Sequence, residues 1–125
     1  FKTLVAGPGV TITPAPTQVT ISAAPTASLL EVEAVVGSNY SVTSANDLII
    51  VDTSGADRTI TLPSAVGIAG KVFYIKKISA ANTVFVESVS GQTLDGVDID
   101  ASPHPIAVQY ESITIVSDGA NYVII

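Results

Sequence analysis

The stretch 40–63, YSVTSANDLIIVDTSGADRTITLP, constrains the fold of this chain more than any other. Its four successive apolar residues at 48–51 indicate a strand covered on both faces, because neighbouring side chains on a strand point to opposite sides. Residues 58–62 alternate apolar and polar side chains, which indicates a strand with one buried face. We therefore predict a strand over 47–53 that pairs with 58–62 through a tight turn at 54–57.

Short segments rich in Val, Ile, Thr and aromatic residues recur between turn residues along the rest of the chain, at intervals of about ten residues. Further strands are predicted at 29–37, 71–78, 83–88, 110–117 and 122–125, with a short edge strand at 93–94 and a loop at 95–105. The strand at 83–88 is predicted to form a hairpin with 71–78, and the C-terminal strand 122–125 is predicted to be paired. This pattern predicts an all-β fold, a compact antiparallel β-sandwich or barrel.

Segment 29–37, LLEVEAVVG, permits two interpretations. Ser28 could cap a short helix and Gly37 could end it. The alternation of apolar residues with two glutamates favours a strand, with Leu30, Val32, Ala34 and Val36 on one face. We predict the strand.

The first 28 residues differ from residues 29–125 in proline content and sequence pattern, so we divide the chain into these two parts. Four of the seven prolines lie in this first segment, which argues against a regular sheet formed within one chain. Its sequence VTIT at 10–13 recurs as VTIS at 19–22, as in an elongated, shaft-like element whose units are completed by neighbouring chains. The alternative is a proline-rich linker.

Composition favours an oligomer and excludes two classes of partner. Only 13% of residues are charged and 47% are hydrophobic, against about 25% charged in an average soluble domain. We expect copies of the chain to cover this apolar surplus. No apolar run approaches the roughly 20 residues that cross a bilayer. The net charge of −6, with five scattered basic residues, does not suit nucleic acid.

The chain has no cysteine, so disulfides and thiol chemistry are excluded. Its first residues, FKTLVAGPG, do not show the pattern of a signal peptide. Because the sequence lacks an initiator Met, we expect it to be a fragment or a processed product.

A resemblance to the fibre proteins of tailed bacteriophages covers nearly the whole chain, and four segments carry it: GPGVTIT…QVTIS, YSVTSANDLIIVDTSGADRTITLPSAVGIAGKVFYIKKISAANTVFV, GQTLDG and QYESITIVSDGANYVII. The resemblance implies a trimeric virion fibre, on the tail or the head, in which a shaft precedes a compact β-domain. It also implies that upstream virion proteins hold the fibre and that the β-domain contacts the host surface. The prolines of segment 1–28 depart from a long regular shaft.

Residues that could perform chemistry are few. Asp95, Asp98 and Asp100 place three carboxylates close together, but they lack the order and the distal Glu of a calcium loop, so we interpret them as a solvated turn. The single histidine, His104, lies between two prolines without a nucleophile pattern. Four further carboxylates, Asp47, Asp52, Asp57 and Glu111, could form an acid pair only by accident. We expect no catalytic, metal or cofactor-binding residues and no enzymatic activity.

Tyr40, Tyr74, Tyr110 and Tyr122 are the candidate receptor contacts, because an exposed aromatic ring packs against the C–H face of a sugar. Core or interface packing is the competing role for each. The pair Lys76-Lys77 could meet an acidic polymer or protect an edge strand from aggregation.

The leading hypothesis is a structural fibre domain of the virion, a homotrimer that attaches the phage to a bacterial glycan or protein receptor. The alternative is a carbohydrate-binding β-sandwich module of a larger secreted protein.

Overall fold

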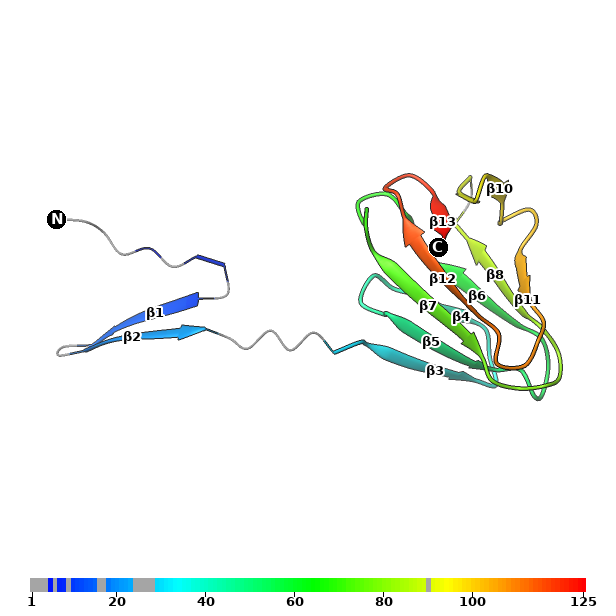
Figure 1. Cartoon of the computed structure of the whole chain (residues 1–125), viewed down its shortest axis with the longest axis horizontal. Coiled ribbons are helices and arrows are strands. Elements are labelled where there is room, and N and C mark those ends of the chain that lie inside the picture. The colour runs from blue at the N-terminus through cyan, green and yellow to red at the C-terminus, as the bar shows by residue number, and fades with distance from the viewer. Residues whose placement is uncertain (1–4, 6, 9, 16–17, 24–28, 90) are drawn as a thin grey trace.

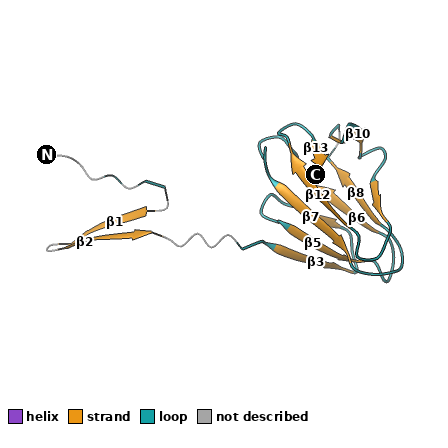
Figure 2. Cartoon of the chain, viewed as in Figure 1, coloured by secondary structure: helices purple, strands orange, loops and turns teal. Residues whose placement is uncertain are grey.

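The computed structural model describes residues 5, 7–8, 10–15, 18–23, 29–89 and 91–125 of the chain (Figure 1). Every regular element in this part is a β-strand, as the sequence predicted (Figure 2). The strands are β1 (Val10–Ala15), β2 (Gln18–Ala23), β3 (Val32–Val36), β4 (Tyr40–Ser41), β5 (Leu48–Asp52), β6 (Arg58–Leu62), β7 (Val72–Lys77), β8 (Val84–Ser88), β9 (Thr93–Leu94), β10 (Val97–Asp98), β11 (His104–Ile106), β12 (Ser112–Ser117) and β13 (Tyr122–Ile124).

Strands β1 and β2 carry the VTIT and VTIS repeat and pair with each other as an antiparallel hairpin. Pro14 lies in β1 opposite Val19. A sheet of two strands has only edges, where proline is tolerated, so the prolines do not prevent pairing within the chain. Pro16 and Pro25 lie outside the described residues.

The other strands form two sheets of mixed direction that bury one apolar core between them, as in a β-sandwich. The larger sheet has seven strands in the order β10-β9-β13-β12-β7-β5-β3, and the smaller has four in the order β11-β8-β6-β4. The core takes residues from both sheets, including Ile49 and Phe73 of the larger and Ile60 and Val86 of the smaller.

From β3 to β8, successive strands fall alternately in the two sheets. Strands β3, β5 and β7 are therefore parallel neighbours in one sheet, and β4, β6 and β8 are parallel neighbours in the other. Val32 aligns with Leu48 and Leu48 with Tyr74, so one turn of this winding takes 16 residues and the next takes 26. This is the arrangement of a short, two-sided β-solenoid.

The C-terminal strands close one end of the winding with antiparallel pairs. Strand β12 pairs with β7 and with β13, and β11 pairs with β8. The predicted pairing of the last strand is confirmed. At the opposite end, β3 and β4 are the last strands of their sheets.

Two predicted hairpins are wrong, and the predicted antiparallel sandwich is a mixed one. Strands β5 and β6 lie in different sheets, as do β7 and β8. Five residues separate β5 from β6, which is more than a tight two-residue hairpin turn needs and lets the chain cross between sheets about 10 Å apart. Both strands of each pair also present an apolar face to the same core, so they meet across it rather than edge to edge.

Segment 93–105 is more regular than predicted. Strand β9 is not an edge, because it pairs with both β10 and β13. The predicted loop 95–105 contains β10 and the start of β11.

Two aromatic rings pack against each other in the part of the core near the C-terminus. Phe73 and Tyr122 meet edge to face, with ring centroids 6.3 Å apart. The Tyr122 hydroxyl donates a 2.7 Å hydrogen bond to the carbonyl oxygen of Pro63, and burial raises the pKa of this side chain to about 12. The link joins β13 to the end of β6, so it connects the two sheets.

Replacing Ile60 tests this shared core. Ile60 has no exposed surface and lies in the smaller sheet facing the larger one. We expect Ile60→Ala to lower the free energy of unfolding by about 3 kcal/mol, because it removes buried methyl groups and leaves a cavity. The control, Val66→Ala at a residue 66% exposed, should change it by less than about 0.5 kcal/mol. Urea unfolding of both variants measures the difference, and equal effects would contradict the assignment of Ile60 to the core.

Candidate binding surface

The described residues contain no group of three or more His, Cys, Asp or Glu side chains placed to hold a metal ion. In the aspartate segment, Asp95 accepts a 3.0 Å hydrogen bond from the backbone N–H of Ile124. Asp98 accepts from the N–H groups of Asp100 and Ala101. The Asp98 carboxylate thus holds the turn that follows β10, and the Asp95 carboxylate bonds strand β13.

His104 lies in β11, not in a loop, and its backbone is aligned with Val86. It is half-buried and lines a hollow of about 370 Å³ together with Asp95, Ile99 and the two prolines that flank it.

The described residues include no helix that could span a membrane.

The four candidate tyrosines divide into two groups. Tyr122 has no exposed surface and is a core residue, so it is not available to a receptor. Tyr40 is half-buried against the core, and its hydroxyl donates to the side-chain oxygen of Asn46 at 3.2 Å. Tyr74 and Tyr110 are exposed, at 39% and 62%. Register fixes which side of the sheet the rings of Tyr40, Tyr74 and Tyr122 face, whereas Tyr110 lies in the turn before β12.

Lys76 lies near both exposed tyrosines. It lies two residues after Tyr74 on the same face of β7, and its ammonium group is 5.9 Å from the centroid of the Tyr110 ring. Its Nζ also donates to the carbonyl oxygen of Tyr110. The structure thus gathers Tyr74, Lys76 and Tyr110 on one side of the larger sheet.

Lys77 points the other way and has no exposed surface. Its Nζ donates to the carbonyl oxygen of Ser79. Strand β7 lies between β5 and β12, so it is not an edge. The prediction of a surface pair of lysines that protects an edge strand is therefore wrong.

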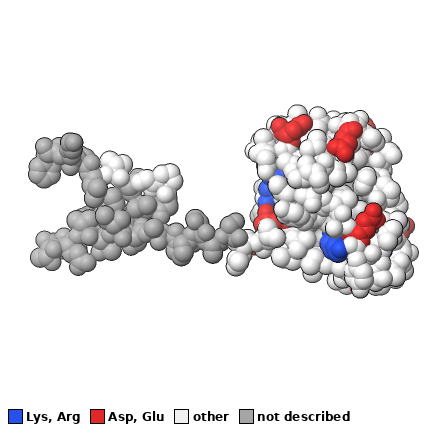
Figure 3. All heavy atoms as spheres, in the orientation of Figure 1, with Lys and Arg blue, Asp and Glu red and all other residues white. Residues whose placement is uncertain are grey.

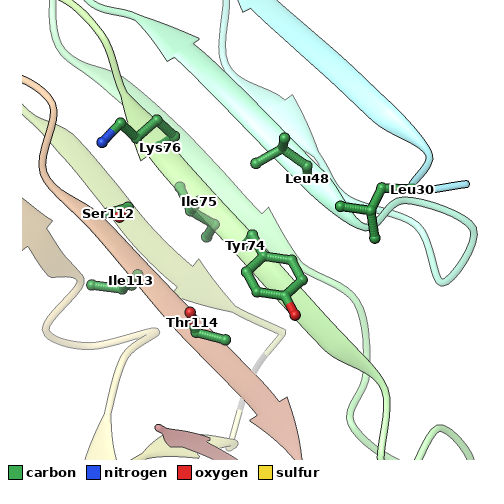
Figure 4. Close-up of a pocket in the computed structure, with 8 residues that line it drawn as sticks. All are labelled: Leu30, Leu48, Tyr74, Ile75, Lys76, Ser112, Ile113 and Thr114. Carbon is green, nitrogen blue, oxygen red and sulfur yellow. The ribbon is translucent and has the colours of Figure 1, made fainter.

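A hollow of about 330 Å³ opens beside Tyr74 (Figure 4). Tyr74 is aligned with Leu48 on β5 and with Thr114 on β12, so its ring lies between these two side chains. The full lining is Leu30, Leu48, Tyr74, Ile75, Lys76, Ser112, Ile113 and Thr114.

This hollow belongs to a larger apolar surface on the outside of the seven-stranded sheet. We call it the outer apolar face and define it by Leu30, Val32, Ala34, Val36, Leu48, Ile50 and Tyr74. The sequence run 48–51 predicted a strand covered on both faces, but nothing in the described part of the chain covers this one. The predicted apolar row of segment 29–37 also faces outward here, while Val35 is the residue that enters the core.

The outer side of the four-stranded sheet is different. Ser41, Thr59, Thr61 and Glu87 lie on it, and the Thr61 hydroxyl donates to the Glu87 carboxylate at 2.7 Å. Phe85 is its one large apolar residue on β4, β6 and β8. The two outer sides of the sandwich thus differ, one polar and one apolar.

An ion pair marks one corner of the outer apolar face. Lys71 contacts Asp47, whose other carboxylate oxygen accepts from the backbone N–H of Glu31 at 2.8 Å. Hydrogen bonds from Lys71 and then from Glu31 hold the pKa of Asp47 below its usual value of 3.8. One carboxylate therefore ties together the residues that precede β3, β5 and β7.

No family model matches this chain, and no curated protein matches it. The fold and the outer apolar face are therefore the observations on which a function can be proposed.

The lowered pKa of Asp47 predicts acid sensitivity. A carboxylate with a lowered pKa in the folded state stabilises the fold above its unfolded pKa, and this contribution is lost as the pH falls below about 4 toward the folded value. We expect Asp47→Asn to unfold at a lower temperature than the wild type at pH 7. Its unfolding temperature should also fall by less than that of the wild type when the pH is lowered to 2. Thermal unfolding by circular dichroism across this range measures both effects; parallel curves would contradict the ion-pair role.

Proposed function

We propose that this chain is a structural domain of a bacteriophage fibre, which assembles as a homotrimer and attaches the virion to the host surface. The single observation that carries the proposal is an uncovered apolar face on a β-solenoid winding. Monomeric proteins rarely expose contiguous apolar patches larger than a few hundred Å², and larger ones mark interaction sites. The resemblance of the sequence to phage fibres supplies the class of assembly.

The winding from β3 to β8 supports the same proposal. Each turn of a solenoid gains its contacts from the turns beside it, which suits an element that is extended along an axis. In this proposal the hairpin β1-β2 belongs to the shaft-like segment 1–28, other virion proteins lie upstream, and residues 29–125 form the outward domain.

We propose no enzymatic role. The carboxylates of Asp95, Asp98 and Glu111 accept backbone hydrogen bonds. These contacts are those of structural residues rather than of an acid pair across a substrate groove.

Assembly and attachment are measured on the same full chain. We expect sedimentation equilibrium to give three times the 12.7 kDa mass of one chain. We also expect fluorescently labelled protein to bind some strains in a panel of bacteria and not others, by flow cytometry. A monomer at all concentrations would contradict the trimer, and failure to bind any strain would contradict attachment by this domain.

The second candidate function is a carbohydrate-binding module. Tyr110, 62% exposed and next to Lys76, favours it, because a ring with one free face and a neighbouring donor suits a sugar. The positive φ of Tyr110, 63°, places this residue in a conformation that bulky side chains rarely adopt.

A glycan array tests this candidate. If the module binds sugars through Tyr110, Tyr110→Ala should weaken binding about fivefold, the equivalent of about 1 kcal/mol for a lost aromatic contact. Tyr40→Phe serves as the control, since the Tyr40 hydroxyl bonds internally to Asn46. An array without hits would remove the carbohydrate-binding module.

A further inference from the structure

The residues of the outer apolar face form one continuous surface. Leu30, Val32, Val36 and Tyr74 are 54%, 50%, 70% and 39% exposed, and they are contiguous across β3, β5 and β7. Leu48 and Ile50 lie half-buried between them. The aliphatic side chains thus form one surface that the described part of the chain leaves in contact with water.

The carboxylates of the described residues lie mostly elsewhere. Glu87 is on the polar side of the sandwich, and Asp95, Asp98 and Asp118 lie in or beside β10 and the turn before β13, at the end of the body remote from β3. The view in Figure 3 shows charged atoms in a few small groups with a broad uncharged area between them.

Charged residues at the border of the outer apolar face include Glu31 and Glu33, and four others have partners. Asp47 is paired with Lys71, and Lys76 donates to the Tyr110 carbonyl. Asp52, at the far end of β5, accepts from the backbone N–H of Ser54. The face therefore presents no block of like charge, although the whole chain carries −6.

Strand β3 adds an open edge to this surface. It is the last strand of the seven-stranded sheet and pairs with β5 alone. Strand β3, VEAVV, has neither the lysine nor the proline that commonly protects an edge strand, and Glu33 is its one charged residue. Another polypeptide could approach both the edge and the face beside it.

We propose that the outer apolar face, with the edge of β3, is the surface through which copies of this chain associate. The inference rests on the proposed homotrimer and assigns its contact surface. Two copies with a charge of −6 each repel, so they meet with least repulsion at a surface whose middle carries no carboxylate, and the middle of this face, Leu48, Ile50 and Tyr74, carries none.

The test introduces one carboxylate into each sheet at matched positions. Ala34 is exposed in the terminal strand of the larger sheet, and Ser41 is exposed in the terminal strand of the smaller one. We expect Ala34→Glu to raise the dissociation constant of the full-chain oligomer at least about tenfold, because association would bury like charges together. Ser41→Glu should leave it unchanged, as measured by sedimentation velocity over a concentration series.

Two outcomes overturn the proposal in different ways. If the wild type is an oligomer and Ala34→Glu dissociates no more than Ser41→Glu, the contact surface is wrong while the homotrimer stands. If the wild type is a monomer at every concentration, both the surface and the homotrimer are wrong. Attachment to bacteria is measured separately and bears on neither result.

A second measurement uses a small uncharged thiol in place of the glutamate. The chain has no cysteine, so one introduced thiol is a specific reporter. In the native oligomer, Ala34→Cys should react with a maleimide at least about tenfold more slowly than Ser41→Cys, and the two rates should converge in urea. Equal rates in the native oligomer would overturn the assignment.

Discussion

The structure depends on one apolar core that neither sheet can complete alone. Along β5 and β7, Ile49, Val51, Phe73 and Ile75 point inward and have no exposed surface. Their partners across the core come from β6 and β8, which the chain enters immediately after each of those strands. Because consecutive strands stand on opposite sides of the core, contacts between sheets form over short sequence separations, while neighbours within a sheet are a full turn apart.

The sequence was sufficient to locate most strands and insufficient to pair them. Alternation and β-branched residues indicated β6, β8 and β12 close to their observed bounds. Pairing is decided by the crossing between sheets, and no local pattern distinguishes a five-residue crossing from a hairpin loop. Where the turn is tight the prediction succeeded: Asp118 accepts from the N–H groups of Ala120 and Asn121, and β12 and β13 pair across that turn.

The candidate surface could be predicted in part. The run 48–51 correctly indicated a strand with apolar side chains on both faces, but not that one face would stay open within the chain. Among the tyrosines, the sequence could not distinguish Tyr122 from Tyr110, although Tyr122 enters the core as the first residue of β13 and Tyr110 lies exposed in the turn before β12. Lys77 illustrates the same limit: its charge predicts exposure, yet its place in β7 directs it inward.

The two ends of the winding are unequal, and this gives the body a direction. Antiparallel strands β11 and β12 occupy the end next to β7 and β8, whereas β3 and β4 have neighbours on one side only. The turns between these ends differ in length, 16 residues and 26, while the strands they connect stay in register. Evolution could therefore insert or remove whole turns of the winding between these two ends, without changing the end formed by β11 and β12 or the contact between Phe73 and Tyr122.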